Sequence, residues 1–311
     1  MNRVLTAFSQ QARDGGRGRM AMTTMRWAGA ILVLLSMLSG CGTREDRNVT
    51  LPGPAGDRTA IVYHPSSAGP GAPLVMVSHG ANGSAEQARA SFGWDALADR
   101  YGFVVAYPDA LDGRWNAGTC CRKYNSPKVD DVSFLHDLRG QLITEDEVDP
   151  KRVFAVGASN GAMLSYAWAC TRAGDLAGIG VVSGALTVPC PTPAPITVVA
   201  IHGSVDKVVP LNGGASVGGP GNNVVYPSLE EALAPFRAAA KCPADPHIQV
   251  DPPATVWTWR CADGREIVRD VIDGEGHGWP RRESKADSSE APSDITGFLW
   301  SQLGNAPPAT S

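Results

Sequence analysis

Residues 152–161 of the sequence read RVFAVGASNG. The β-branched and aromatic residues of 152–156 are typical of a strand, and residues 162–169, which read AMLSYAWA, are typical of a helix. A G-x-S-x-G pattern between a strand and a helix forms a sharp turn that exposes the serine hydroxyl. Glycine at the flanking positions avoids collisions between the two elements, and the helix N-terminus adds a positive dipole end. The stretch therefore predicts that Ser159 is a nucleophile.

The same pattern occurs a second time at residues 214–218, which read GASVG. This copy lies within a run of Gly, Asn and Pro residues, with no strand before it and no helix after it. The surrounding elements, and not the five residues alone, create a nucleophilic turn. We therefore expect a flexible loop around Ser216, and we expect Ser159 to be the reactive serine.

Short apolar segments alternate with helical ones along the rest of the chain. This alternation predicts one α/β domain, residues 53–303, with a mostly parallel sheet covered by helices on both faces. Ligands of such sheets bind beyond the carboxyl ends of the strands. The expected strands are residues 59–63, 73–77, 103–107, 152–156, 178–182, 196–201 and 266–272, and the expected helices are residues 84–100, 132–142, 162–169, 229–240 and 293–303.

Two residues beyond later strands are candidates for an acid and a base. Asp206 lies a few residues after the strand 196–201, and an acid at that place would orient a histidine. His277 follows the last expected strand and lies between Gly276 and Gly278, where a loop could carry it to Ser159 as general base. An ordinary turn aspartate and a surface histidine are the alternatives. His202 is set aside because it is too close in sequence to Asp206.

The loop that follows the strand 73–77 reads SHGANG and is the candidate oxyanion-binding segment. In this type of fold that loop donates one backbone N–H, and the residue after the nucleophile donates the second. We assign these donors to Ala81, with Gly80 as the alternative, and to Asn160. The loop also reads as a glycine-rich turn that opens the helix 84–100, and the two interpretations are compatible.

With these residues in the order Ser159, Asp206, His277, the chain resembles the α/β-hydrolase superfamily. It is similar to the polyhydroxybutyrate depolymerases and the feruloyl and acetyl-xylan esterases over residues 50–303, almost the whole chain after the leader. The family often has G-L-S-N-G-G at the turn, where this chain has Ala158 and Ala162. The matching segments are residues 78–80, 107–109, 115–116, 120–121, 129–132, 148–153, 157–161, 201–206 and 277–280.

The resemblance implies a serine-dependent carboxylic ester hydrolase that works through an acyl-enzyme and needs no cofactor. A transferase that passes the acyl group to an acceptor of the cell envelope, and a lipid-anchored binding protein without the chemistry, are the alternatives. No insertion long enough for a lid separates the turn from Asp206, which favours short or aromatic acyl groups or a polyester. Trp115 and Trp279 either wall an acyl pocket or pack inside the protein. Asp130 and Asp131 either cap a helix or lie near the site.

Residues 1–40 read as an export leader, with Arg26, an apolar run and the stretch Leu38-Ser39-Gly40 before Cys41. That stretch resembles a lipoprotein cleavage site, so we expect a lipid on Cys41, a tether over 41–52 and an exported protein of the cell envelope. A plain signal peptide followed by a chance cysteine, which would give a secreted protein, is the alternative. Residues 304–311 read as a tail. The formal net charge of −4 and the lack of a basic run exclude a nucleic-acid partner.

The sequence has seven cysteines, and six remain when Cys41 is set aside; an even number in an exported protein favours disulfides. Cys242 and Cys261 flank an expected hairpin and are the first predicted pair. We expect the adjacent Cys120 and Cys121 to bond to different partners, and the pairing with Cys170 and Cys190 stays open. A zinc site is the rival interpretation, but no C-x-x-C or H-x-x-H spacing supports it.

Overall fold

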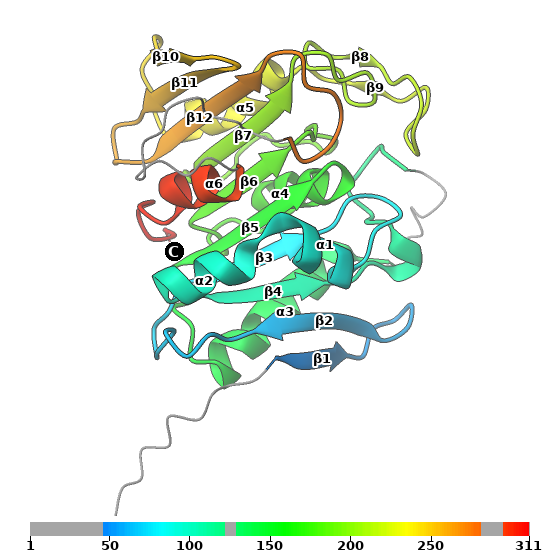
Figure 1. The fold of residues 1–311 in the computed structure, drawn as a ribbon, viewed down its shortest axis with the longest axis vertical. Coiled ribbons are helices and arrows are strands. Elements are labelled where there is room, and N and C mark those ends of the chain that lie inside the picture. The colour runs from blue at the N-terminus through cyan, green and yellow to red at the C-terminus, as the bar shows by residue number, and fades with distance from the viewer. Residues whose placement is uncertain (1–45, 122–128, 281–294, 311) are drawn as a thin grey trace, which may run out of the picture. The chain divides into compact units, whose positions relative to one another are not determined.

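A computed structural model describes residues 46–121, 129–280 and 295–310 (Figure 1). A ten-stranded sheet with the order β1-β2-β4-β3-β5-β6-β7-β12-β11-β10 lies at its centre. The strands of this sheet are β1 (Arg47–Leu51), β2 (Arg58–Tyr63), β3 (Leu74–Ser78), β4 (Val104–Pro108), β5 (Val153–Ala158), β6 (Gly178–Val182), β7 (Thr197–Gly203), β10 (His247–Asp251), β11 (Ala254–Arg260) and β12 (Glu266–Ile272).

The centre of the sheet is parallel from β4 through β3, β5, β6 and β7 to β12. The strands at both edges, β1 and β2 on one side and β10 and β11 on the other, are antiparallel to their neighbours. The predicted α/β fold with a mostly parallel sheet is therefore confirmed, and the carboxyl ends of the parallel strands all meet at one edge.

Side chains of the central strands alternate between two cores, as the period of two in a strand requires. In β7, Val198 and Ala200 pack into one core, whereas Val199 and Ile201 pack into the other. Because both faces are buried, these strands read as continuous apolar runs in the sequence.

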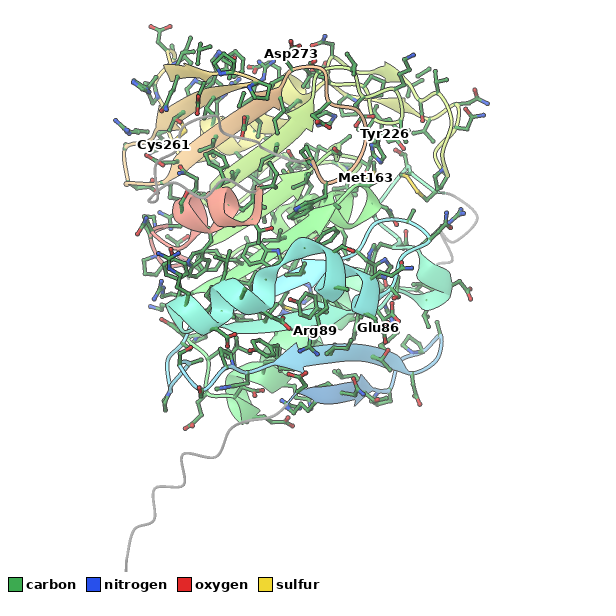
Figure 2. All side chains as sticks on the ribbon, in the orientation of Figure 1. Glu86, Arg89, Met163, Tyr226, Cys261 and Asp273 are labelled. Carbon is green, nitrogen blue, oxygen red and sulfur yellow. A yellow bond between two sulfur atoms is a disulfide. The ribbon has the colours of Figure 1, made fainter. Side chains whose placement is uncertain are left out.

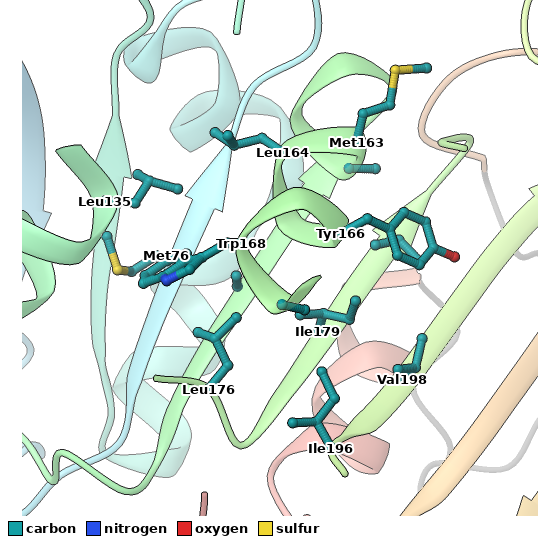
Figure 3. Packing of buried hydrophobic residues seen from close by; sticks show 14 of the residues in the cluster. Met76, Leu135, Met163, Leu164, Tyr166, Trp168, Leu176, Ile179, Ile196 and Val198 are labelled. Atoms are coloured by element: carbon teal, nitrogen blue, oxygen red, sulfur yellow. The ribbon is translucent and has the colours of Figure 1, made fainter. Parts of the chain in front are cut away.

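Helices cover both faces (Figure 1). Residues of α1, α2 and α6 line one core and those of α3, α4 and α5 line the other. Figure 3 shows Tyr166 of α4 on the side of Ile179 of β6, and Trp168 of the same helix on the side of Met76 of β3. The helices are α1 (Ala85–Phe92), α2 (Trp94–Tyr101), α3 (Asp131–Glu145), α4 (Asn160–Thr171), α5 (Leu229–Ala239) and α6 (Ile295–Leu303), with a short 3-10 turn at Leu111–Gly113.

The structure differs from several of the sequence-based expectations. The flexible loop expected around Ser216 is a short hairpin in which Ser216 is buried. The helix expected over 84–100 is two helices, because Gly93 takes a φ of 72° and ends α1. Part of the expected tether forms the edge strand β1, which pairs with β2. The expected tail packs on the domain, where Ala306 and Ala309 are buried. Residues 1–40, Cys41 and the start of the tether lie outside the described residues.

Three disulfides join the six cysteines that follow Cys41. The predicted pair of Cys242, after α5, and Cys261, after β11, is confirmed. The expectation for the adjacent cysteines is wrong: Cys120 bonds to Cys121, because α4 brings Cys170 to Cys190 and leaves no other partner.

A small second sheet joins β8 (Gly214–Ala215) to β9 (Val225–Tyr226) in the segment between β7 and α5. This hairpin contains the second copy of the G-x-S-x-G pattern. None of the helices in the described ranges has the length and apolarity needed to cross a membrane.

Candidate active site

Ser159 occupies the sharp turn between β5 and α4, with a φ of 53° and a ψ of −116°. Such a conformation costs a residue other than glycine on the order of 1–3 kcal/mol, so the surrounding chain must hold it. The Ser159 N–H donates to the carbonyl of Val182 at 2.8 Å, which ties the turn to β6. A Cβ on Gly157 would lie 2.3 Å from the backbone of Gly161, so the tight crossing of strand and helix requires glycine.

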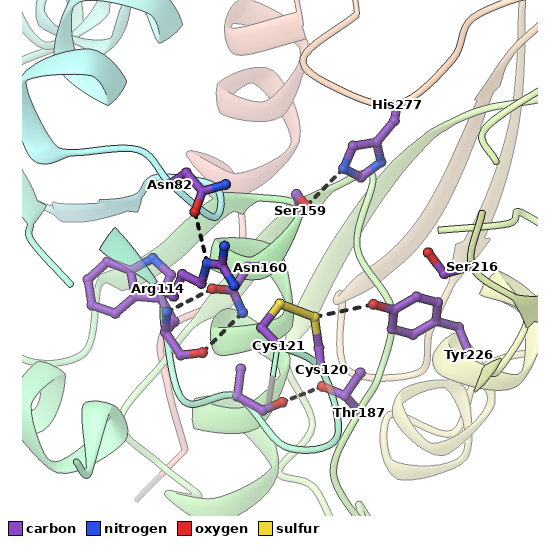
Figure 4. Close-up of a disulfide and its surroundings, with 12 residues drawn as sticks. Asn82, Arg114, Cys120, Cys121, Ser159, Asn160, Thr187, Ser216, Tyr226 and His277 are labelled. Carbon is purple, nitrogen blue, oxygen red and sulfur yellow. Dashed lines mark hydrogen bonds between the residues drawn. A yellow bond between two sulfur atoms is a disulfide. The ribbon is translucent and has the colours of Figure 1, made fainter. Parts of the chain in front are cut away.

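His277 joins the nucleophile to the acid. Its Nε2 lies 2.8 Å from the Oγ of Ser159, and its Nδ1 lies 2.8 Å from Oδ2 of Asp206 (Figure 4 shows the first of these contacts). The three residues follow β5, β7 and β12, which end at the same edge of the sheet. The structure therefore brings together the three residues that the sequence singled out, at hydrogen-bonding distances typical of a nucleophile, base and acid.

Asp206 is buried and surrounded by hydrogen-bond donors. Its Oδ1 accepts the N–H groups of Val208 and Val209 at 2.8 and 2.9 Å, while Oδ2 faces His277. Burial raises the pKa of this carboxyl, but hydrogen bonds from His202, His277 and Val209 outweigh it and hold the pKa well below its ordinary value. Asp206 is therefore ionised at neutral pH and can stabilise a positively charged imidazole.

His202 is a neighbour of the site that sequence reasoning set aside. Its Nε2 lies 2.7 Å from the carbonyl of Val209 and 3.4 Å from Oδ2 of Asp206. A carbonyl only accepts, so this Nε2 carries a proton. His202 therefore approaches the same carboxylate oxygen as His277, although its closeness to Asp206 in sequence seemed to exclude it from the site.

The loop that carries His277 is packed against the end of β7. A Cβ on Gly203 would lie 2.2 Å from the carbonyl oxygen of Glu275, so only glycine allows this close approach. The N–H of Val205 donates to the same carbonyl at 3.0 Å. Beyond His277, the half-buried Trp279 stacks on Phe92 with ring centroids 4.1 Å apart.

The two proposed oxyanion donors flank the nucleophile. Asn160 is the first residue of α4, where an N–H has no partner within the helix. The loop containing Ala81 comes close to the turn, because a Cβ on Gly161 would lie 2.4 Å from the carbonyl oxygen of Ser78. A Cβ on Gly80 would lie 3.7 Å from the Cβ of Ser159. The loop after β3 and the first residue of α4 therefore both lie beside Ser159, and the assignment of Ala81 and Asn160 as oxyanion donors stays a prediction.

Of the two candidate tryptophans, the packing interpretation holds for Trp115. This residue is fully buried, and its ring N–H donates to the carbonyl of His79 at 2.8 Å. Its backbone N–H and carbonyl bond to the side chain of Asn160 at 2.7 and 3.1 Å. Trp115 therefore joins the loop after β3 to the start of α4.

The helix-capping interpretation holds for Asp130, whose carboxylate accepts the N–H of Ser133 at 2.9 Å. Asp131 is buried and bonds to the guanidinium of Arg58 and to the N–H of Asn116, each at 2.5 Å. Burial raises the pKa of Asp131, and Arg58 acts in the opposite direction. Asp131 thus holds the backbone of Asn116, the residue after Trp115, and does not contact Ser159 itself.

The second candidate serine, Ser216, lies on a different loop from Ser159, and within the described part of the chain its hydroxyl makes no hydrogen bond to His277 or Asp206. Ser216 follows β8, and its hydroxyl donates to the carbonyl of Gly218 at 3.2 Å. In Figure 4 Ser216 lies on a different loop from Ser159 and His277, near Tyr226.

Tyr226 donates to the sulfur of Cys120 at 3.2 Å. Burial and the nearby Asp206 charge raise the pKa of Tyr226 to about 12, so its hydroxyl keeps its proton.

The side-chain arrangement agrees with a site at one edge of the sheet. Figure 2 shows Met163 and Tyr226 toward the edge where the parallel strands end, and Cys261 toward the opposite edge.

Within the described ranges, no group of three or more His, Cys, Asp or Glu side chains has the geometry of a metal site.

A strained serine between strand and helix, with a histidine and an ionised aspartate after later strands, defines a serine hydrolase of the α/β-hydrolase class. A family model described as Esterase PHB depolymerase matches residues 58–211. The putative esterase NocK of Nocardia uniformis subsp. tsuyamanensis is 30% identical over 248 residues, which cover 73% of this chain and 72% of that protein. The chain belongs to this esterase family, and the predicted resemblance is confirmed.

Other comparisons agree with the assignment. Feruloyl esterase B of Piromyces equi is 26% identical over 71% of this chain, which spans only 42% of that longer protein. The structure of the acetyl xylan esterase from Aspergillus awamori matches 83% of this chain and 99% of its own length, with a TM-score of 0.59 at 15% identity. The structural likeness shows the shared fold, and the family places the chain among carboxylic ester hydrolases.

Proposed function

We propose that Ser159, His277 and Asp206 hydrolyse a carboxylic ester in two steps. The Oγ of Ser159 attacks the carbonyl carbon while Nε2 of His277 takes its proton. The tetrahedral oxyanion is held by the N–H groups of Ala81 and Asn160. When the intermediate collapses, the leaving alcohol takes the proton from His277, and the acyl group stays on Ser159. Water, deprotonated by His277, then releases the acid and regenerates the serine.

One observation carries this proposal. The imidazole of His277 contacts the nucleophile and the acid at the same time, at 2.8 Å on each side. The ionised Asp206 fixes the tautomer in which Nδ1 carries the proton and Nε2 is free to accept one. A binding protein that had lost the chemistry would have no need of this arrangement or of the strained serine.

The substrate we propose is an ester with a short or aromatic acyl group, presented on a polymer or as a small molecule. Between α4 and Asp206 the chain forms only β6, β7 and their connection, so this part contributes no lid. An open site suits esters on an accessible surface better than long acyl chains that need burial. The names of the family and of the feruloyl esterase relative support the same substrate class.

The test compares wild type with Ser159→Ala on a panel of p-nitrophenyl and hydroxycinnamate esters. We expect activity on acetate, butyrate or ferulate esters and a loss of at least ~10³-fold in Ser159→Ala. Ser216→Ala is the matched control, since Ser216 has the same local sequence pattern and should keep wild-type activity. Near-wild-type activity of Ser159→Ala would contradict the mechanism, and a clear preference for long acyl chains would contradict the open site.

We also propose that the protein is exported and anchored by a lipid on Cys41. The three disulfides support export, because thiols oxidise outside the cytoplasm. Cys41→Ala should move the protein from the membrane fraction to the soluble fraction of a bacterial host and abolish labelling by radioactive palmitate. Unchanged membrane association of the variant would contradict the anchor.

A further inference from the structure

A buried serine that no part of the mechanism uses lies between the strands of the nucleophile and of the acid. Ser183 directly follows β6, and β6 pairs with β5 on one side and with β7 on the other. Its N–H donates to the carbonyl of Ile201 in β7 at 2.9 Å. The preceding residue, Val182, accepts the N–H of Ser159. The backbone at this position is therefore fixed to both parts of the site.

The side chain of Ser183 reaches the loop of the catalytic histidine. Its hydroxyl donates to the carbonyl of Gly278 at 2.8 Å and accepts the N–H of Gly278 at 3.3 Å. Gly278 comes directly after His277, so both polar groups of that residue's backbone are held by one hydroxyl. Ser183 is fully buried, and water therefore does not compete for these contacts.

The backbone of Ser183 has a strained conformation that glycine would adopt more easily. Its φ is 51°, in the left-handed region that glycine adopts without strain and serine does not. The next residue, Gly184, is pressed against the turn, because a Cβ there would lie 3.2 Å from the carbonyl oxygen of Ser159. Glycine would suit the backbone at 183 better than serine, so what serine adds at this position is its side chain.

We propose that Ser183 is a positioning residue for His277. It anchors the loop on the C-terminal side of His277, as Gly203 and Val205 anchor it on the N-terminal side through Glu275. With both sides fixed, the imidazole stays within hydrogen-bonding distance of Ser159 and Asp206. This inference rests on the proposed hydrolysis, because it assigns Ser183 a part in orienting the base.

Two variants separate the hydroxyl from the backbone strain. Ser183→Ala removes the hydroxyl and keeps the strain, whereas Ser183→Gly removes both. We expect kcat on p-nitrophenyl acetate to fall by ~10- to 100-fold in each, because a small misplacement of a catalytic group costs that much. KM should stay within about threefold, since the ester-binding surface is untouched. Thermal unfolding should begin no lower in Ser183→Gly than in Ser183→Ala.

A proton NMR signal reports on His277 directly. A histidine N–H bonded to a buried carboxylate resonates far downfield of the amide protons, and we expect this signal to broaden in both variants. Ser165→Ala is the matched control, because Ser165 is equally buried and its hydroxyl donates to Gly161 within its own helix. That variant should keep the kcat and the signal of wild type.

The outcomes distinguish this inference from the function it rests on. If Ser159→Ala is inactive while Ser183→Gly keeps wild-type kcat and an unchanged signal, the hydrolase mechanism stands and the positioning role is wrong. A loss in Ser183→Ala that Ser183→Gly does not share would also overturn it, because the hydroxyl would not be the cause. A rise in KM at constant kcat would point to substrate binding and contradict the inference in the same way.

Discussion

The carboxylate of Asp206 is held by hydrogen-bond donors on both of its oxygens. One oxygen accepts two backbone N–H groups, and the other faces two histidines, of which only His277 contacts the nucleophile. Sequence reasoning found Asp206 and His277 because each follows a recognisable strand. It missed Ser183, since a lone serine after a strand has no pattern, and its contact with Gly278 spans 95 residues of sequence.

Asp206→Asn should lower kcat/KM by ~10³- to 10⁴-fold. An amide cannot keep His277 in the tautomer whose Nε2 accepts the serine proton, nor stabilise the charged imidazole. Esterase kinetics on p-nitrophenyl acetate check this, with Asp251→Asn, an exposed position of β10, as the control. A loss of less than tenfold would mean that another acid orients His277.

The lowered pKa of Asp206 also predicts how stability varies with pH. A carboxyl whose pKa is lower in the folded protein stabilises the fold above its ordinary pKa, and that contribution disappears as pH falls through the folded value. The difference in free energy of unfolding between wild type and Asp206→Asn should stay constant from neutral pH to about pH 4 and shrink below it. Urea unfolding at several pH values measures this, and a difference that grows in acid would refute it.

Elements are placed in this fold by the close contacts that glycine permits. Gly157 and Gly161 let β5, α4 and the loop after β3 meet at the nucleophile, and Gly203 does the same for β7 and the His277 loop. The motif at 157–161 made the first of these contacts predictable from the sequence. The strand β1 was not predictable, because most of its residues, which read RNVTL, are polar and resemble a tether. Their strand conformation depends on pairing with β2, which only the fold supplies.

Gly161→Ala should destabilise the protein by about 1–3 kcal/mol and lower its activity. The new Cβ would lie 2.4 Å from the carbonyl oxygen of Ser78 and push the loop after β3 away from α4. Gly140→Ala is the matched control, since Gly140 is an exposed position within α3 with nothing near its Cβ. That change should stabilise by about 0.5–1 kcal/mol. Chemical denaturation measures both, and equal effects would contradict the packing account.

At the scale of the whole molecule, the alternating pattern of the sequence was enough to predict the sheet, its parallel centre and the edge that carries the site. The edge strand β1 and part of the cysteine pairing were harder to predict, because each depends on which distant segments the fold brings together. Cys242 and Cys261 were predictable because an expected hairpin separates them, whereas the link between Cys120 and Cys121 became apparent only once α4 had brought Cys170 to Cys190.

The cysteine pairing gives a prediction for the intact protein. In a Cys41→Ala background, unfolded but unreduced protein should contain no free thiol, because three disulfides hold the remaining cysteines. Each of the two longer links, with sequence separations of 19 and 20, should contribute about 3 kcal/mol to stability in the chain-entropy account. Thiol titration with and without reductant checks the pairing. Two or more free thiols before reduction would contradict it.

In the proposed mechanism one serine, activated by His277 and Asp206, attacks the ester. A fluorophosphonate probe identifies that serine, since the probe reacts with a serine only when a base has activated it. Mass spectrometry of labelled, folded protein should show one adduct per chain, located on Ser159, absent in Ser159→Ala and retained in Ser216→Ala. An adduct on any other residue, or no adduct on folded wild-type protein, would contradict the account.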